Sequence, residues 1–145
     1  MNLMDNPQFS AFISKFKELM ESTQKVSLEE ARKQSTAFFA PPSRVLETMH
    51  RVEDIQIPSK EGHQIPIRLY TPSKTQDLPV FIYYHRGGWV FSNIEEADGV
   101  CRKLANHLDC IVASVDFRLA PENPFPKPFN DCYDAFWGIF FMYAY

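Results

Sequence analysis

A histidine, an arginine and two glycines follow one of the most apolar stretches of the chain. The segment His85-Arg86-Gly87-Gly88-Trp89 comes directly after Val80–Tyr84. If that stretch is a strand of a parallel sheet, the segment lies at its carboxyl end, where such sheets bind ligands. Paired glycines let backbone N–H groups face a bound oxyanion, because no Cβ stands in the way. Taken alone, however, the pair favours the simpler interpretation of a tight turn after a strand.

A second segment is more specific because it matches a long motif. Val115-Asp116-Phe117-Arg118-Leu119-Ala120-Pro121-Glu122-Asn123-Pro124-Phe125-Pro126 continues the apolar run that starts at Ile111. It resembles the V-D-Y-R-L-A-P-E-x-P-F-P stretch of the hormone-sensitive-lipase-like α/β-hydrolases, a group of carboxylesterases and lipases with an H-G-G-G-W signature. Ser27–Arg32, Ile65–Pro72 and Asp131–Ala135 resemble other segments of that family, and all of them occur in the right order.

The resemblance implies a carboxylic ester hydrolase that uses a serine acyl-enzyme and no metal or cofactor. Its substrate would be a small acyl ester. Gly87 and Gly88 match the glycines whose N–H groups form the oxyanion hole. His85 matches a residue that shapes this loop, and Trp89 matches one beside the substrate pocket. The resemblance also implies loop-shaping roles in the proline-braced second segment for three charged residues: Asp116, Arg118 and Glu122.

Two departures from the family pattern bear on activity. Arg86 stands where the family has the first glycine of H-G-G-G. A positive φ there would cost arginine roughly 1 kcal/mol or more. Its cation would either assist catalysis or obstruct the ester site, and we expect obstruction. The second departure is that no G-x-S-x-G nucleophile elbow exists, and no histidine follows the place where it should stand. A serine without a base is a poor nucleophile.

We therefore expect the chain to correspond to the N-terminal half of an α/β-hydrolase and to be inactive on its own. In one hypothesis another polypeptide or reading frame supplies the missing half. In the other, the chain is a non-catalytic module that binds acyl ligands or a partner protein. The aromatic end Gly138–Tyr145 is atypical of the family's helix and indicates an altered terminus that favours self-association.

Helix signals fill the first third of the chain. Asn6-Pro7 predicts the start of one helix, and Ser27 with Glu30 forms a capping box for a second. We interpret residues 1–48 as a helical cap segment and residues 49–145 as a truncated α/β-hydrolase core. The two helices are either ordinary core helices or a lid over a cleft, because the first has a broad phenylalanine-rich face.

The core segment alternates strands and helices. Alternating residues around Ile57 and Ile65 predict an antiparallel hairpin at a sheet edge, and Pro66 favours the edge position. The apolar runs Val80–Tyr84 and Ile111–Val115 predict parallel strands that are buried on both faces, the second with an open edge.

Two helices are expected in this core. Ser92 and Glu95 predict the cap of a connecting helix that buries a face ending at Leu108. A final helix should begin near Pro128. Four of its side chains should face the core: Cys132, Ala135, Phe136 and Ile139.

Composition narrows the functional class. The 145 residues are 45% hydrophobic with a net charge of -3, which favours a globular domain and argues against nucleic-acid binding. The longest uncharged apolar run, Ala135–Tyr145, is about half the ~20 residues of a membrane span. The three cysteines form no C-x-x-C pair, so we expect free thiols rather than a zinc site, no signal peptide, and a cytoplasmic location.

Overall fold

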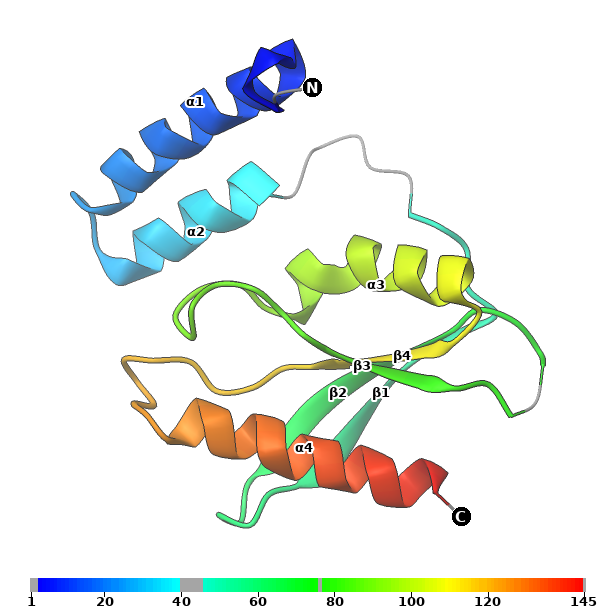
Figure 1. Cartoon of the computed structure of the whole chain (residues 1–145). Coiled ribbons are helices and arrows are strands. Elements are labelled where there is room, and N and C mark those ends of the chain that lie inside the picture. The colour runs from blue at the N-terminus through cyan, green and yellow to red at the C-terminus, as the bar shows by residue number, and fades with distance from the viewer. Residues whose placement is uncertain (1–2, 40–45, 76, 145) are drawn as a thin grey trace. The chain divides into compact units, whose positions relative to one another are not determined.

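The computed structural model describes residues 3–39, 46–75 and 77–144 (Figure 1). The chain divides into two compact units, Met1–Arg44 and Val45–Tyr145. The first holds a short 3-10 turn, Leu3–Asp5, and two helices, and the second holds a sheet with two helices.

The first unit is a pair of helices, α1 (Pro7–Thr23) and α2 (Leu28–Phe39). Both expected starts are confirmed. The Asn6 side chain accepts the backbone N–H of Gln8 at 2.9 Å, and the Ser27 hydroxyl accepts that of Glu30 at 3.3 Å. Each cap satisfies a backbone donor that has no partner inside the helix.

Phenylalanine rings hold the two helices together. Phe12 and Phe16 of α1 lie 5.7 and 6.2 Å from Phe38 of α2, measured between ring centroids. Phe39 adds a contact of 6.3 Å to Phe16. The phenylalanine-rich face of α1 therefore has a partner inside its own unit, and a role as a lid stays a prediction.

The second unit is a four-stranded mixed sheet of β1 (Arg51–Pro58), β2 (Gln64–Thr71), β3 (Val80–Tyr84) and β4 (Ile111–Val115). The strand order is β1-β2-β4-β3. β1 and β2 form the expected antiparallel hairpin, β4 pairs antiparallel with β2, and β3 pairs parallel with β4. The crossover helix α3 (Ile94–Leu108) links the parallel strands, as expected for a βαβ unit.

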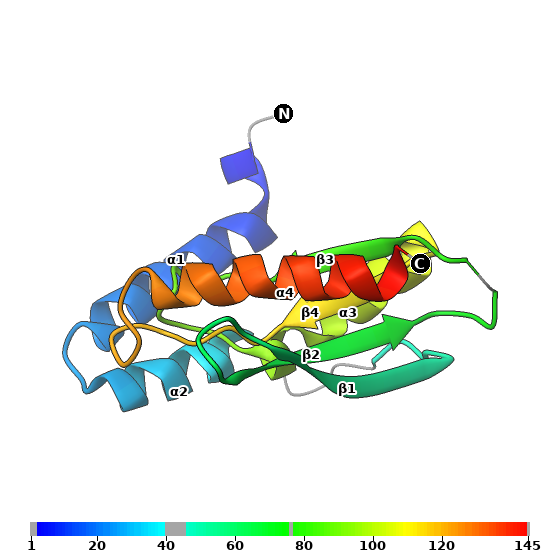
Figure 2. The same ribbon diagram turned by 90° about the horizontal axis from the view of Figure 1, so that it is seen from below.

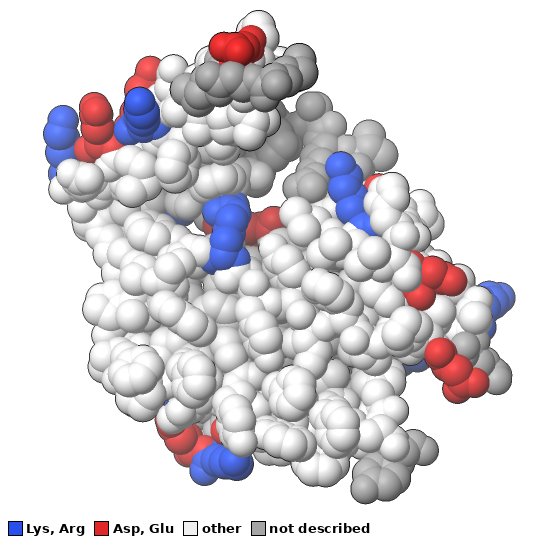
Figure 3. All heavy atoms as spheres, in the orientation of Figure 1, with Lys and Arg blue, Asp and Glu red and all other residues white. Residues whose placement is uncertain are grey.

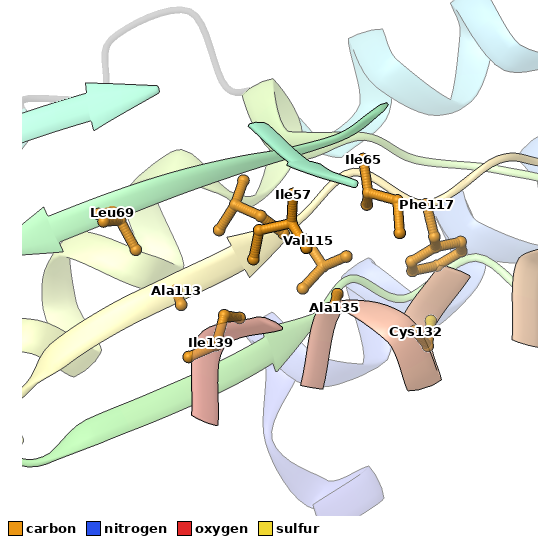
Figure 4. Packing of buried hydrophobic residues seen from close by; sticks show 10 residues of the cluster. Ile57, Ile65, Leu69, Ala113, Val115, Phe117, Cys132, Ala135 and Ile139 are labelled. Atoms are coloured by element: carbon orange, nitrogen blue, oxygen red, sulfur yellow. The ribbon is translucent and has the colours of Figure 1, made fainter. Parts of the chain in front are cut away.

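Helices cover both faces of this sheet. Figures 1 and 2 show α3 on one face and α4 (Lys127–Tyr143) on the other. The α4 side holds the larger core, in which Ala135 and Ile139 pack against strand residues such as Ala113 and Val115 (Figure 4). The α3 side is smaller and is built around Tyr70, which is fully buried. Among the described residues, no helix is long and apolar enough to cross a membrane.

The strand order corrects two expectations about the sheet edges. β2 lies inside the sheet and only β1 is an edge of the hairpin. Pro66 is tolerated because the β2–β4 register begins one residue later, at Ile67, while the Pro66 carbonyl still accepts the N–H of Asp116 at 2.9 Å. β4 has neighbours on both sides, so the open edge belongs to β3, which is only partly buried.

Three details of the helices also differ from expectation. The cap of α3 is Asn93, whose side chain accepts the N–H of Glu96 at 3.0 Å, so the capping motif lies one residue later than predicted. Leu108 and Phe136 are exposed, although both were expected to point inward. Each residue lies next to the buried face of its helix. The spacing of apolar residues in the sequence does not show where that face ends.

Candidate functional site

The loop after β3 depends on glycine at position 87. Gly87 has φ of +120°, and a Cβ added there would lie 2.0 Å from the carbonyl oxygen of Phe91. The Gly87 carbonyl accepts the N–H groups of Val90 and Phe91 at 3.1 and 2.9 Å, which closes the turn. No other residue fits this position without moving the backbone.

Gly88 and Trp89 continue the same left-handed turn, with φ of +59° and +68°. Nothing lies within 4 Å of a Cβ built on Gly88, so the space beside its backbone is open. The Trp89 carbonyl accepts the N–H of Ala120 at 2.8 Å, which joins this loop to the segment after β4. The two segments singled out in the sequence are therefore in direct contact.

His85 lies beneath the loop in a buried position. Its Nδ1 donates to the Arg86 carbonyl at 2.9 Å, and its ring stacks on Phe117 with centroids 4.1 Å apart. Burial lowers the pKa of His85, so the imidazole is neutral near pH 7. Its Nε2 is buried and has no hydrogen-bond partner in the described part of the chain. This geometry suits a residue that shapes the loop.

Arg86 is turned toward α3. Its Nη2 donates to Glu96 Oε2 at 3.1 Å, and the Glu96 side chain is only 1% exposed. Arg86 is absent from the residues with positive φ, so the expected cost of an arginine at this position does not arise. The positive φ angles belong to the three residues that follow it, two of which are glycines.

Asp116 lies between β4 and the start of α3. Its backbone N–H donates to the Pro66 carbonyl at 2.9 Å. Burial raises the pKa of the Asp116 carboxyl, while the nearby His85 and the backbone N–H of Ile94 oppose that rise. Asp116 is therefore close to both His85 and the first turn of α3.

Arg118 lies at the centre of a polar cluster. Its guanidinium donates to Asp131 at 2.7 and 2.9 Å, its backbone N–H donates to the same carboxylate at 2.9 Å, and Glu61 accepts at 2.8 Å. These contacts link the segment after β4, the helix α4 and the β1–β2 turn. Glu122, the third charged residue singled out, is exposed in the segment between β4 and α4.

A serine and a histidine of the β1–β2 turn form a set with an aspartate of α4, which was not predicted from the sequence. Ser59 Oγ lies 2.7 Å from His63 Nδ1, and His63 Nε2 lies 2.9 Å from Asp131 Oδ1. The residue types are those of a nucleophilic triad. Asp131 is 68 positions from His63, so the local pattern around the turn gives no sign of the contact.

The surroundings of Ser59 argue for a structural role. The N–H groups of Ser59 and Gly62 are bonded to carbonyls of the turn, and that of Lys60 donates to Asp134 at 2.8 Å. The His63 N–H donates to Ser59 Oγ itself. Acyl transfer needs donors free to bind a developing oxyanion. The four N–H donors named here are engaged, so the set closes the turn.

In the described part of the chain, candidate metal ligands stand apart from one another. Within residues 3–39, 46–75 and 77–144, no three His, Cys, Asp or Glu side chains form a cluster that could hold an ion. In the loop after β3, the described polar groups are backbone N–H groups, the neutral imidazole of His85 and the guanidinium of Arg86, which is paired with Glu96.

Comparison with known proteins agrees with this geometry. A family model for the α/β hydrolase fold matches residues 81–140. An arylesterase from Saccharolobus solfataricus is 41% identical over 75 residues, which are 52% of this chain and 24% of that relative. The carboxylesterase NlhH of Mycobacterium tuberculosis is 38% identical over 109 residues, or 74% of this chain and 34% of the relative. Over the matched residues, the chain is similar to the hormone-sensitive-lipase-like α/β-hydrolases.

Solved structures of such hydrolases share the fold. An esterase from Pyrobaculum calidifontis is 40% identical with a TM-score of 0.73, over 81% of this chain and 38% of that chain. The apo crystal structure of ESTFA has a TM-score of 0.83 at 29% identity, over 96% and 45% of the two chains. The chain thus spans less than half of these structures, and between 22% and 34% of the curated relatives.

Proposed function

We propose that this chain provides the oxyanion-binding loop of a carboxylic ester hydrolase. The N–H groups of Gly87 and Gly88 would receive the carbonyl oxygen of an acyl ester as negative charge develops on it. One observation carries the proposal: the loop lies at the carboxyl end of β3, with two glycines of positive φ and open space beside Gly88. The relatives named as esterases support the choice of substrate class.

The remaining loop residues would hold this surface in place. His85 would brace the loop from below, with Asp116 close to it, and Trp89, which is 45% exposed, would flank the bound acyl or alcohol group. Arg86 would anchor the loop to α3 through Glu96 instead of folding over the glycines, because its guanidinium already donates there. This assignment replaces the expectation that Arg86 obstructs the site.

The chain alone would not hydrolyse esters. It contains no G-x-S-x-G sequence, and His85 keeps its Nδ1 on a carbonyl and buries its Nε2. Without an activated serine and a base, the reaction cannot proceed through an acyl-enzyme. A further polypeptide segment would have to supply the nucleophile, the base and the acid that orients it.

A second candidate function is a binding module for acyl compounds. Two observations favour this function. Gly87 and Gly88 have the positive φ angles that an anion-binding loop can use, and the sequence contains no G-x-S-x-G nucleophile motif. Both functions use the same two N–H groups, and they differ only in whether turnover follows binding.

Amide NMR can test the proposed loop directly. Titration with butyrate, a short acyl oxyanion, should shift the amide signals of Gly87 and Gly88. Gly62 is the matched control, since it also has positive φ and open space but lies in the β1–β2 turn. Equal shifts at all three glycines, or none at Gly87 and Gly88, would contradict the proposal.

Enzyme assays address turnover separately. We expect no hydrolysis of short-chain p-nitrophenyl esters above the solvent background and no serine labelled by a fluorophosphonate. Turnover that stops when one serine is labelled would show that the chain holds its own nucleophile.

A further inference from the structure

A buried carboxylate of α4 binds the segment that follows β4. Asp131 Oδ2 accepts the backbone N–H of Arg118 at 2.9 Å, and the Asp131 side chain is only 2% exposed. A hydrogen bond to a carboxylate is strong where water does not reach it, so it holds its donor closely. Asp131 therefore fixes the position of the Arg118 peptide group relative to α4.

The candidate oxyanion loop rests on this segment on both sides of Arg118. Just before Arg118, Phe117 stacks on the imidazole of His85, with ring centroids 4.1 Å apart. Just beyond it, the Ala120 N–H donates to the Trp89 carbonyl at 2.8 Å. The peptide group held by the carboxylate of α4 thus lies between the two contacts of the loop, and a shift of this group would move both.

His63 joins the same carboxylate to a third part of the chain, the β1–β2 turn. Asp131 Oδ1 accepts from Arg118 Nη2 at 2.7 Å and from His63 Nε2 at 2.9 Å. Oδ2 accepts from the Nε and the backbone N–H of Arg118, each at 2.9 Å. Within the described residues, every hydrogen-bond donor to Asp131 other than His63 belongs to Arg118.

Ser59 orients the imidazole of His63. The His63 backbone N–H donates to Ser59 Oγ at 3.2 Å, which leaves the hydroxyl hydrogen free to reach His63 Nδ1 at 2.7 Å. The hydrogen of the neutral ring then lies on Nε2 and faces Asp131, because a carboxylate can only accept. Ser59 therefore sets both the direction of the ring and the nitrogen that carries the hydrogen.

The turn that carries His63 is anchored by further contacts. Glu61 accepts from Arg118 at 2.8 Å and from Asn130 at 3.0 Å, and the Lys60 N–H donates to Asp134 at 2.8 Å. Figure 3 shows acidic and basic side chains together over this turn, whereas few lie over α4. The turn is thus fixed against α4, so His63 approaches the carboxylate from a defined position.

We propose that His63 is a positioning residue for the oxyanion loop, which it reaches through Asp131 and residues 117–120. This inference rests on the proposed function of Gly87 and Gly88. Asp131 is already buried among the described residues, so His63 keeps this role whether or not a further polypeptide segment completes the hydrolase.

The donor on His63 acts by fixing the orientation of the Asp131 carboxylate. With Nε2–H in place, the carboxylate is held where it also accepts the Arg118 N–H. Without this donor, the carboxylate turns toward the guanidinium and its contact with the backbone N–H loosens. The loop that rests on this segment then shifts, and a misplacement of about 1 Å is enough to weaken a site of this kind.

Amide hydrogen exchange at Ala120 tests this role. In His63→Gln the side-chain amide can donate in place of Nε2, whereas the side chain of His63→Met has a similar length and no donor. His107→Met is the control, because the His107 side chain is 75% exposed on α3. Relative to the amides of β4, Ala120 should exchange at least about tenfold faster in His63→Met. The rate should stay close to that of the unchanged chain in His63→Gln and in the control.

Two results of this experiment would overturn the inference. If His63 only stabilised the whole unit, Ala120 and β4 would exchange faster by the same factor. Equal effects of His63→Met and His63→Gln would show that the donor at Nε2 does not hold the segment. Circular dichroism reports whether each variant folds. If His63→Met does not fold, Ser59→Ala decides, because it removes the group that orients the ring: faster exchange at Ala120 is then expected, and an unchanged rate overturns the inference.

Butyrate titration separates this inference from the proposed function. The dissociation constant measured at Gly87 and Gly88 should rise at least about threefold in His63→Met and recover in His63→Gln. Equal affinity of the unchanged chain and His63→Met overturns the positioning role and leaves the proposed function intact. If the unchanged chain binds no butyrate, the proposed function fails, and the ligand-free amide signals of the two glycines decide. They should shift in His63→Met and return in His63→Gln, and signals that do not move overturn the positioning role.

Discussion

The imidazole of His85 lies flat against the ring of Phe117, with an angle of 11° between the two planes. Trp89 contacts the same Phe117 ring edge-on, with 5.1 Å between the two ring centroids. His85 directly follows β3 and Phe117 follows β4 by two residues, so this contact joins the carboxyl ends of the two parallel strands. The candidate oxyanion loop therefore rests on one aromatic ring of the neighbouring strand.

Removing that ring should destabilise the sheet unit. Phe117 is 4% exposed and belongs to the main hydrophobic core, so Phe117→Ala should lower the free energy of unfolding by about 3–5 kcal/mol. Phe125→Ala is the control, because Phe125 is 83% exposed, and its effect should stay within about 0.5 kcal/mol. Urea titration followed by circular dichroism measures both. Equal effects would show that Phe117 is not a core residue.

The two loop glycines should respond differently to alanine. Gly87→Ala brings a Cβ against the Phe91 carbonyl in a backbone conformation that few residues other than glycine adopt. Gly88→Ala meets no atom and costs only the left-handed conformation, about 1 kcal/mol. Urea titration should therefore rank Gly87→Ala as clearly less stable than Gly88→Ala. The reverse order would contradict the loop geometry.

The buried His85 should make stability depend on pH. Because the pKa of His85 is lowered in the folded chain, the unfolded chain binds a proton more readily. The contribution of His85 is complete above its ordinary pKa of about 6.5 and is lost as pH falls toward its lowered value. The free energy of unfolding should fall more for the unchanged chain than for His85→Gln between about pH 7.5 and pH 5. Parallel curves would show that His85 is not buried as neutral imidazole.

Asp116 acts in the opposite sense and has to be measured with His85. Its pKa is raised by burial, so the folded chain gains stability as pH falls through that raised value. An Asp116→Asn background removes this opposing contribution, and the effect of His85→Gln should persist there.

A double-mutant cycle can locate the Arg86 side chain. Arg86→Gln leaves the buried Glu96 carboxylate without this donor, and Glu96→Gln leaves the guanidinium without this acceptor. The two changes should be non-additive by at least about 0.5 kcal/mol in the free energy of unfolding. Additive effects would favour an Arg86 side chain that points away from α3.

The three cysteines should resist modification in the folded chain. All of them are buried, and burial raises the pKa of Cys101 to about 11 and that of Cys132 to about 12. Burial also raises the pKa of Cys110. Since the thiolate is the reactive form, a disulfide reagent at about pH 8 should label no cysteine quickly, and three after denaturation. Rapid labelling of one thiol would reveal local opening around it.

Local patterns in the sequence predicted the local structure well. Asn6 and Ser27 cap their helices as expected, and the hairpin and the parallel pair form where the periodicity places them. In each case the feature that predicts the structure lies within a few residues. It is a side-chain oxygen that caps a helix, or a run of alternating or continuous apolar residues in a strand.

Strand neighbours were harder to predict because they depend on contacts between distant segments. β3 and β4 both have uncharged, largely apolar sequences, yet only β4 lies between two strands. The partners of Asp131 also come from separate parts of the chain, with His63 before β2 and Arg118 after β4. No periodicity records such contacts, and the family resemblance singled out the Asp131 segment without naming its partners.

The position of β4 between β2 and β3 has a consequence for the order in which the sheet assembles. β1 and β2 meet across a tight turn, whereas Ile67 of β2 pairs with Val115, 48 positions further along the chain. Val80 of β3 pairs with Ile111, which is 31 positions later. The hairpin can therefore form early, while β3 remains without a partner until the crossover helix and β4 have been synthesised. Closure of the sheet is a late, non-local step, and β4 is the strand that completes it.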